Sequence, residues 1–85
     1  MDKPLVPYRI STVKPTGNVF FAKISGFNAE YVVTLLVASL KHETEVLEQT
    51  VLPHDIGYIT YRNVNGDKMR LKIERERSTR KGVAQ

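Results

Sequence analysis

The longest apolar stretch of the chain runs from Tyr31 to Leu40, and the pattern around it predicts a helix. Asn28 stands just before the stretch, where its side-chain oxygen can accept a hydrogen bond from an amide of the first helical turn. Glu30 falls in that turn, where the helix dipole favours a negative charge. The residues from Ala38 to Gln49 contain no Gly or Pro and are rich in Leu and Glu. The helix is therefore predicted to continue well beyond the apolar stretch.

A second interpretation of the end of this region stays open. Residues that suit a strand occupy every even position but one between 44 and 52: Thr44, Val46, Thr50 and Leu52. β-Branched side chains pack well on a pleated surface, so a strand is the alternative to a continuing helix. Pro53 ends either element, because it lacks an N–H group and restricts the residue before it.

The predicted helix is apolar on almost every side. Only Glu30, Thr34 and Lys41 form a narrow polar seam along it. Such a helix cannot lie on a small sheet with half its surface in water, so it needs a second cover. A second copy of the chain would supply that cover. The sequence therefore predicts a homodimer, with an interface formed by Tyr31, Leu35, Leu36, Ala38 and Leu40.

Two stretches before the helix alternate as strands do. They run from Tyr8 to Val13 and from Val19 to Ser25, and a turn containing a proline and a glycine separates them. This arrangement predicts a β-hairpin. In its second strand, strict alternation would place Phe20, Ala22 and Ile24 on one face.

The segment from Gly57 to Arg75 is predicted as a second hairpin, whose register depends on the length of its loop. A two-residue loop at Asn65-Gly66 would mix polar and apolar side chains on each face. A three-residue loop from Val64 to Gly66, with Gly66 in a left-handed conformation, separates them. The longer loop is therefore predicted. One face then holds Ile59, Tyr61, Met69, Leu71 and Ile73, and the other holds Tyr58, Thr60, Arg62, Lys68, Arg70 and Lys72.

Together these elements predict an α+β fold in the order ββαββ, with two antiparallel hairpins around one long central helix in a dimeric protein. Residues 1–7 are predicted to be an extended leader, residues 8–77 a single domain, and residues 78–85 a flexible basic tail. No stretch is long enough to span a membrane or to serve as a signal peptide. Because the chain has no cysteine, it is expected in the cytoplasm, or inside a host cell if its source is viral.

The formal net charge of +4 is unevenly distributed along the chain. Residues 68–81 hold seven Lys or Arg and two Glu, whereas residues 42–55 hold four carboxylates and neither Lys nor Arg. A basic β-ribbon can follow a phosphate backbone or enter a groove, and a tyrosine within it can stack on a base. The same surface suits an acidic protein partner, and the acidic segment suits a basic neighbour. The residues predicted to bind nucleic acid are Tyr58, Arg62, Lys68, Arg70, Lys72, Arg75, Arg77, Arg80 and Lys81.

The sequence contains no recognisable catalytic or metal-binding pattern. His42-Glu43 begins like the zinc-protease motif, but position 46 is a valine and supplies no ligand. His54-Asp55 is predicted to be a turn, because no nucleophile accompanies it. The turn at Gly17 matches neither the Walker pattern nor the dinucleotide fingerprint, so no cofactor is expected. The chain is therefore predicted not to be an enzyme.

One fragment resembles a known family. The stretch from Val19 to Ile24, followed by Gly26-Phe27-Asn28 and a helix, is similar to the first strand and helix of RNA-recognition-motif domains. That fold has a second helix before its last strand, and the segment from Gly57 to Arg75 leaves no room for one. The base-stacking residues of that family are therefore not carried over to this chain.

Two classes of function follow from these patterns as predictions. The first is a small, non-enzymatic protein that binds DNA or RNA, such as a regulator or an accessory factor of a virus or mobile element. The alternative is a protein-interaction module, such as an adaptor, inhibitor or assembly subunit, that uses its apolar helix and free strand edges. The sequence does not decide between DNA, RNA and protein as the ligand.

Overall fold

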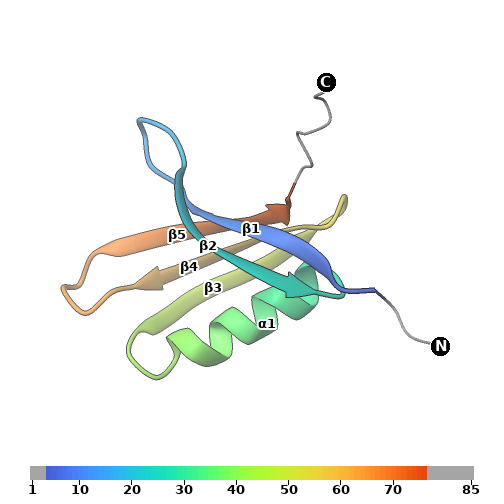
Figure 1. The fold of residues 1–85 in the computed structure, drawn as a ribbon. Helices are drawn as coiled ribbons and strands as arrows, with labels where there is room; N and C mark the ends of the chain where they lie inside the picture. The colour runs from blue at the N-terminus through green and yellow to red at the C-terminus, as the bar shows by residue number, and fades with distance from the viewer. Residues whose placement is uncertain (1–3, 77–85) are drawn as a thin grey trace.

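The structure, a computed structural model, describes residues 4–76 and shows one five-stranded antiparallel sheet with one helix packed on it (Figure 1). In chain order the elements are β1 (Val6–Thr12), β2 (Val19–Gly26), α1 (Ala29–Leu40), β3 (Glu45–Leu52), β4 (Ile56–Arg62) and β5 (Lys68–Arg75). The strand order across the sheet is β2-β1-β5-β4-β3, so β2 and β3 form the two edges. The helix joins these edge strands and crosses one face of the sheet between them.

The predicted ββαββ fold around a long central helix is wrong, because the helix is short and the chain contains a fifth strand. Helix α1 ends at Leu40, and residues Glu45–Leu52 form β3 where the helix was expected to continue. The strand interpretation of this segment is the correct one. Its backbone pairs with β4 along its whole length, and this pairing outweighs the helix propensity of its Leu, Glu and Gln residues. The protein is therefore mainly β, with one short helix, and does not have the predicted α+β architecture.

Both ends of α1 are determined by local hydrogen bonds. At its start, the side chain of Asn28 accepts a hydrogen bond from the backbone N–H of Tyr31 at 2.8 Å, which confirms the predicted cap. At its end, both the hydroxyl and the backbone N–H of Thr44 donate to the carbonyl oxygen of Leu40, at 2.7 and 2.8 Å. Thr44 thus satisfies the carbonyl at the C-terminal end of the helix, and the chain then turns into β3.

The hydrophobic core lies between α1 and the face of the sheet that the helix covers. The sheet contributes Tyr8, Ile10, Ile59, Tyr61, Leu71 and Ile73, and the helix contributes Ala29, Val32, Val33, Leu36 and Val37, all of them buried. One side of the helix is therefore fully used in packing against its own sheet. Burial of these side chains is the main favourable term in the stability of a domain this small.

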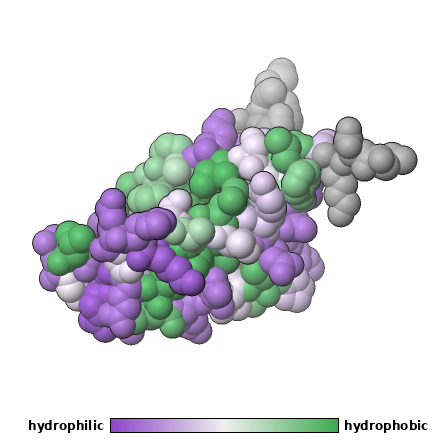
Figure 2. Space-filling view, turned by 90° about the horizontal axis from the view of Figure 1, so that it is seen from below, coloured by the Kyte–Doolittle hydropathy of each residue, from purple (hydrophilic) through white to green (hydrophobic). Residues whose placement is uncertain are grey.

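The homodimer prediction, which depended on a helix apolar on almost every side, gains no support from the described residues. Of the predicted interface residues, Leu36 is only 7% exposed and Leu40 packs against the core. Tyr31, Leu35 and Ala38 do face outward. Figure 2 shows the molecule from the side of α1, with hydrophobic side chains exposed between polar ones. Exposed apolar side chains are common on monomeric proteins and do not by themselves require a second copy.

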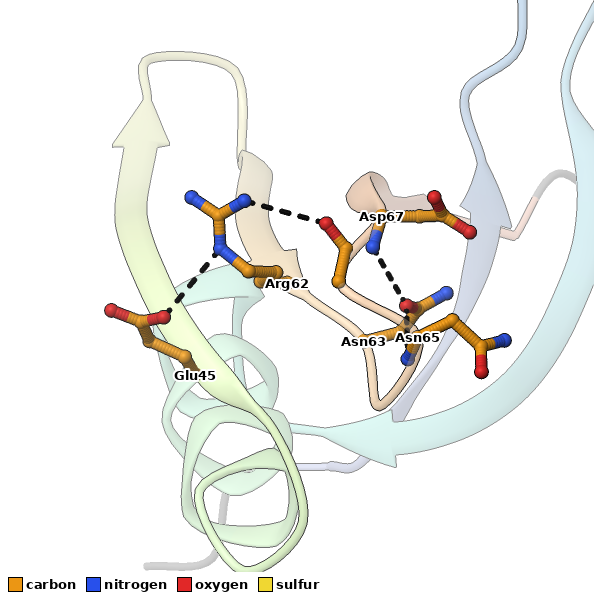
Figure 3. A network of polar contacts seen from close by, with 6 residues as sticks. Glu45, Arg62, Asn63, Asn65 and Asp67 are labelled. Carbon is orange, nitrogen blue, oxygen red and sulfur yellow. Dashed lines mark hydrogen bonds and ion pairs between the residues drawn. The ribbon is translucent and has the colours of Figure 1, made fainter.

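The β4–β5 hairpin has the predicted three-residue loop from Val64 to Gly66. Gly66 has a positive φ of 88°, and its N–H donates to the carbonyl of Asn63 at 2.9 Å. The Asn63 side chain accepts from the N–H groups of Asn65 and Asp67, also at 2.9 Å (Figure 3). The resulting register pairs the strands as predicted, so the apolar and the basic side chains of this hairpin lie on opposite faces.

The β1–β2 hairpin departs from strict alternation. The register shifts after Ile10, so that Ala22 lies opposite Ile10 whereas Phe20 lies opposite Ser11. Phe20 therefore lies on the face without the helix, and the prediction that it shares a face with Ala22 and Ile24 is wrong. A bulge of this kind inserts one residue and reverses the side to which the following side chains point.

The carboxylate of Asp55 joins four parts of the fold. It accepts hydrogen bonds from the hydroxyl of the buried Tyr8 in β1 and from the backbone N–H of Ala29, which begins α1, the latter at 2.8 Å. Arg75 of β5 forms an ion pair with it at 3.6 Å. His54 and Asp55 have positive φ values of 71° and 64°, which confirms the predicted turn between β3 and β4. The carboxylate therefore fixes the start of α1 against the end of β3.

This arrangement predicts that acid weakens the fold. Burial raises the pKa of Asp55, but the Tyr8 hydroxyl, the Ala29 N–H and the Arg75 guanidinium outweigh that effect and hold the pKa below its ordinary value. A lowered pKa means that the folded protein favours the charged carboxylate. The stability that charged Asp55 contributes is therefore fully present above the unfolded pKa of about 4. We expect the free energy of unfolding to fall as the pH is lowered below that value. Urea unfolding between pH 6 and pH 2.5 measures it, and an Asp55→Asn variant should show a smaller decrease.

Candidate functional site

The structure brings together five of the nine residues predicted to bind nucleic acid. Cross-strand pairing places them on the face of the sheet that the helix leaves open: Tyr58, Arg62, Lys68, Arg70 and Lys72. Arg75 lies opposite Tyr8 on the helix side, and is separated from the other five. Arg77, Arg80 and Lys81 lie outside the residues that the structure describes. The basic face is therefore smaller than the sequence suggests.

Several groups on this face already have partners within the chain. Arg62 pairs with Glu45 and donates to the Gly66 carbonyl (Figure 3), and Lys72 pairs with Glu74, both ion pairs measuring 3.6 Å. The guanidinium of Arg70 lies 4.4 Å from the ring centre of Tyr58, so it covers the ring that was predicted to stack on a base. The structure gives no support to nucleic-acid binding here, and the role of these residues stays a prediction.

Two further residues on the open face were missed by the sequence analysis. The guanidinium of Arg9 in β1 lies 4.7 Å from the ring centre of Phe20 in β2. The bulge in the first hairpin places Phe20 there, and nothing in the local sequence identifies that bulge. The open face thus carries two arginine–aromatic pairs, and the small polar side chains of Ser11 and Thr60 on the same face are buried.

The strand β3 is an edge strand that exposes several apolar side chains, as the other edge strand, β2, also does. Every residue of β3 except Val46 is exposed, and Leu47, Val51 and Leu52 are 38%, 44% and 42% exposed. Within residues 4–76, no strand pairs with the outer side of β3. Its outward backbone N–H and C=O groups are therefore available to another extended segment.

A groove separates β3 from the helix. It is lined by Glu30, Val33 and Thr34 of α1 and by Gln49, Thr50 and Val51 of β3, and its volume is about 230 Å³. This is below the range of roughly 300–1,000 Å³ that is usual for pockets binding drug-sized ligands. The groove therefore has room for one long side chain, and not for a cofactor.

The surroundings of this edge are acidic. Glu43, Glu45 and Glu48 lie in or just before β3, and Glu30 lies across the groove on α1. Among the side chains of residues 4–76, Glu45 forms an ion pair with Arg62, while Glu30, Glu43 and Glu48 form none. The β3 edge thus combines a free backbone, exposed apolar side chains and unpaired negative charge.

No protein-family model, curated protein or solved structure matches this chain, so its function has to be argued from its own residues. Among the described residues, no three His, Cys, Asp or Glu side chains are grouped as a metal site would require. In the same part of the chain, no helix has the length and apolar character needed to cross a membrane.

Proposed function

We propose that this protein is a non-enzymatic interaction module that binds an extended, positively charged segment of a partner protein along β3. The observation that carries the proposal is the free edge of β3, where exposed apolar side chains and unpaired carboxylates occur together. Addition of a strand to a sheet edge is a common mode of peptide recognition. The absence of cysteine fits a reducing compartment, so we place this interaction in the cytoplasm.

The geometry of the sheet indicates how such a segment would bind. Hydrogen bonds between the two backbones would supply affinity for any extended sequence. Its alternate side chains would face the helix side, beside Gln49 and Val51, or the open side, beside Glu48 and Thr50. Apolar residues on the added strand would cover Val51 and Leu52, and basic residues would neutralise the carboxylates.

A matched pair of variants tests the site. We expect Val51→Lys to weaken binding of a nine-residue peptide, acetyl-Thr-Val-Thr-Val-Lys-Val-Thr-Val-Thr-amide, by about tenfold or more, because it adds a like charge to the edge. The control is Val19→Lys on β2, the other edge of the sheet, where the valine has a similar exposure of 49%. This control should change the dissociation constant by less than about twofold, since a surface substitution away from the binding edge usually has an effect of that size at most.

Titration of the ¹⁵N-labelled full chain with the peptide identifies the surface directly. The proposal requires the largest chemical-shift changes in β3 and the adjacent side of α1. A mixed-sequence single-stranded oligonucleotide is titrated in parallel at two salt concentrations. If the peptide leaves the spectrum unchanged while the oligonucleotide shifts Arg9, Arg70 and Lys72, the proposal is wrong and the open face is the working surface.

A further inference from the structure

We infer that the groove between α1 and β3 is a specificity pocket for one lysine or arginine side chain of the bound segment. This inference rests on the proposed function, because it assigns a role to the groove beside the strand that β3 would accept. Only an added strand in the plane of the sheet would send side chains to the helix side at the positions of Gln49 and Val51.

The walls of the groove favour a long aliphatic stem. Val33 lies at its base and is 3% exposed, whereas Val51 borders it and is 44% exposed. An inserted side chain would cover the exposed part of Val51 and contact the aliphatic surface of Val33. Lysine and arginine have such stems and can bury them while their charged ends stay near water.

The opening of the groove favours a positive charge at the end of that stem. Its polar groups come from Glu30, Thr34 and Gln49, and the lining contains neither Lys nor Arg. The hydroxyl of Thr34 donates to the backbone carbonyl of Glu30 at 2.9 Å, so towards the groove its oxygen can only accept. The carboxylate of Glu30 is likewise an acceptor. The Gln49 amide offers an acceptor oxygen as well as its NH₂ donors. An ammonium or guanidinium group supplies only donors, and it therefore complements the oxygens of Glu30, Thr34 and Gln49.

The groove is also held in shape by the fold. The Asp55 carboxylate fixes the first residue of α1 against the turn that follows β3, so Glu30 and Val51 keep a defined separation. At the neighbouring Gly57, an added Cβ would lie 2.5 Å from a methyl group of Val33, so the helix approaches the sheet as closely as the backbone allows. A preformed pocket loses less conformational entropy on binding than one that must be ordered.

Three peptides and two variants test this inference. The peptide with a central lysine is compared with versions in which norleucine or glutamate replaces that lysine, since norleucine keeps the aliphatic stem and lacks the charge. We expect the lysine peptide to bind about fivefold more tightly than the norleucine peptide, the size of a partly exposed ion pair. The glutamate peptide should bind most weakly, because its charge would be repelled by the Glu30 carboxylate that lines the groove.

The variants assign the preference to one carboxylate. Glu30→Gln should remove the fivefold preference for lysine and leave the affinity of the norleucine peptide unchanged. The matched control is Glu48→Gln, on the other face of β3, which should keep the preference. Circular dichroism verifies that Glu30→Gln retains its helix, since Glu30 also lies in the first turn.

The outcomes separate this inference from the proposed function. Equal binding of the lysine and norleucine peptides, with shifts in β3, would leave strand addition intact and overturn the groove as a cation pocket. A lysine preference that Glu48→Gln removes and Glu30→Gln leaves unchanged would overturn it as well. Failure of all three peptides to bind would overturn the proposed function itself.

Discussion

Replacing Asp55 by asparagine is expected to lower the free energy of unfolding by about 2–3 kcal/mol, the range for lost hydrogen bonds to a charged group. The Asp55 carboxylate accepts hydrogen bonds from the Tyr8 hydroxyl and the Ala29 N–H and forms an ion pair with the Arg75 guanidinium. These three groups belong to three different elements. An asparagine oxygen can accept from one of the first two groups, but its NH₂ group faces the others as a donor. Either the hydroxyl of Tyr8, a fully buried residue, or the N–H of Ala29 would then lose its acceptor.

Asparagine is chosen because it leaves the backbone of the turn unstrained. Asp55 has a φ of 64°, and asparagine tolerates this left-handed conformation nearly as well as aspartate, whereas alanine does not. The substitution therefore removes the charge and one acceptor while it keeps the shape of the side chain. Any loss of stability can then be assigned to the carboxylate.

Urea unfolding followed by circular dichroism measures the effect, with Asp67→Asn as the control. Asp67 is an exposed residue of the β4–β5 loop, where only its backbone takes part in the hydrogen bonds of the turn. Its substitution should change the free energy of unfolding by less than about 0.5 kcal/mol. If the two variants were equally stable, the network around Asp55 would contribute nothing to the fold.

A double-mutant cycle identifies which partner matters most. Tyr8→Phe removes the hydroxyl and keeps the buried ring, and on its own it leaves the Asp55 carboxylate with one hydrogen-bond donor fewer. Burial and the adjacent Asp55 carboxylate raise the pKa of Tyr8, so this phenol stays protonated and donates at neutral pH. We expect Tyr8→Phe to cost less in the Asp55→Asn background than in the natural chain, since residues in contact are coupled.

Where local sequence signals agreed with one another, they predicted the structure correctly. In the β4–β5 hairpin, the alternation of side chains and the glycine at position 66 both require the same three-residue loop. At the start of α1, Asn28 and Glu30 indicate the same helix boundary. These signals depend on residues close in the chain, so the sequence contains all the information that they need.

Whether residues 45–52 form a helix or a strand could not be predicted from local signals. Leu47, Glu48 and Gln49 favour a helix, whereas Val46, Thr50 and Val51 favour a strand. The difference is decided by pairing with β4, which lies later in the chain. Tertiary pairing of this kind routinely outweighs weak local preferences, and the missing strand produced the error in the predicted fold.

The groove of the candidate site could not be predicted for the same reason, because it is formed in part by β3. Glu30 and Val51 are far apart in the chain, and they line one groove only because α1 crosses the sheet and β3 forms the edge beside it. The basic face was easier to predict, because its register follows from one hairpin. The internal partners of that face were not, since Glu45 reaches Arg62 from β3. The separation of Arg75 from the face was not predicted either, since Asp55 pairs with it from the turn between β3 and β4.

Replacing Leu36 by alanine is expected to lower the free energy of unfolding by about 3 kcal/mol, within the usual range for truncating a leucine in a core. Leu36 is 7% exposed and belongs to the cluster between α1 and the sheet. Its neighbour Leu35 is 41% exposed, so Leu35→Ala should cost less than about 1 kcal/mol. The two variants remove the same atoms from adjacent positions of one helix, and differ only in what those atoms contact.

Unfolding these variants at several protein concentrations distinguishes a residue of the core from a residue of an interface. If α1 is covered by its own sheet alone, the urea midpoint of each variant and of the natural chain will not depend on concentration. If a second copy covered Leu35, the stability of the natural chain would rise with concentration, because association favours the folded state by mass action. Leu35→Ala would then cost as much as Leu36→Ala and would abolish that dependence. A concentration-independent midpoint with unequal costs is the result that the packing of α1 requires.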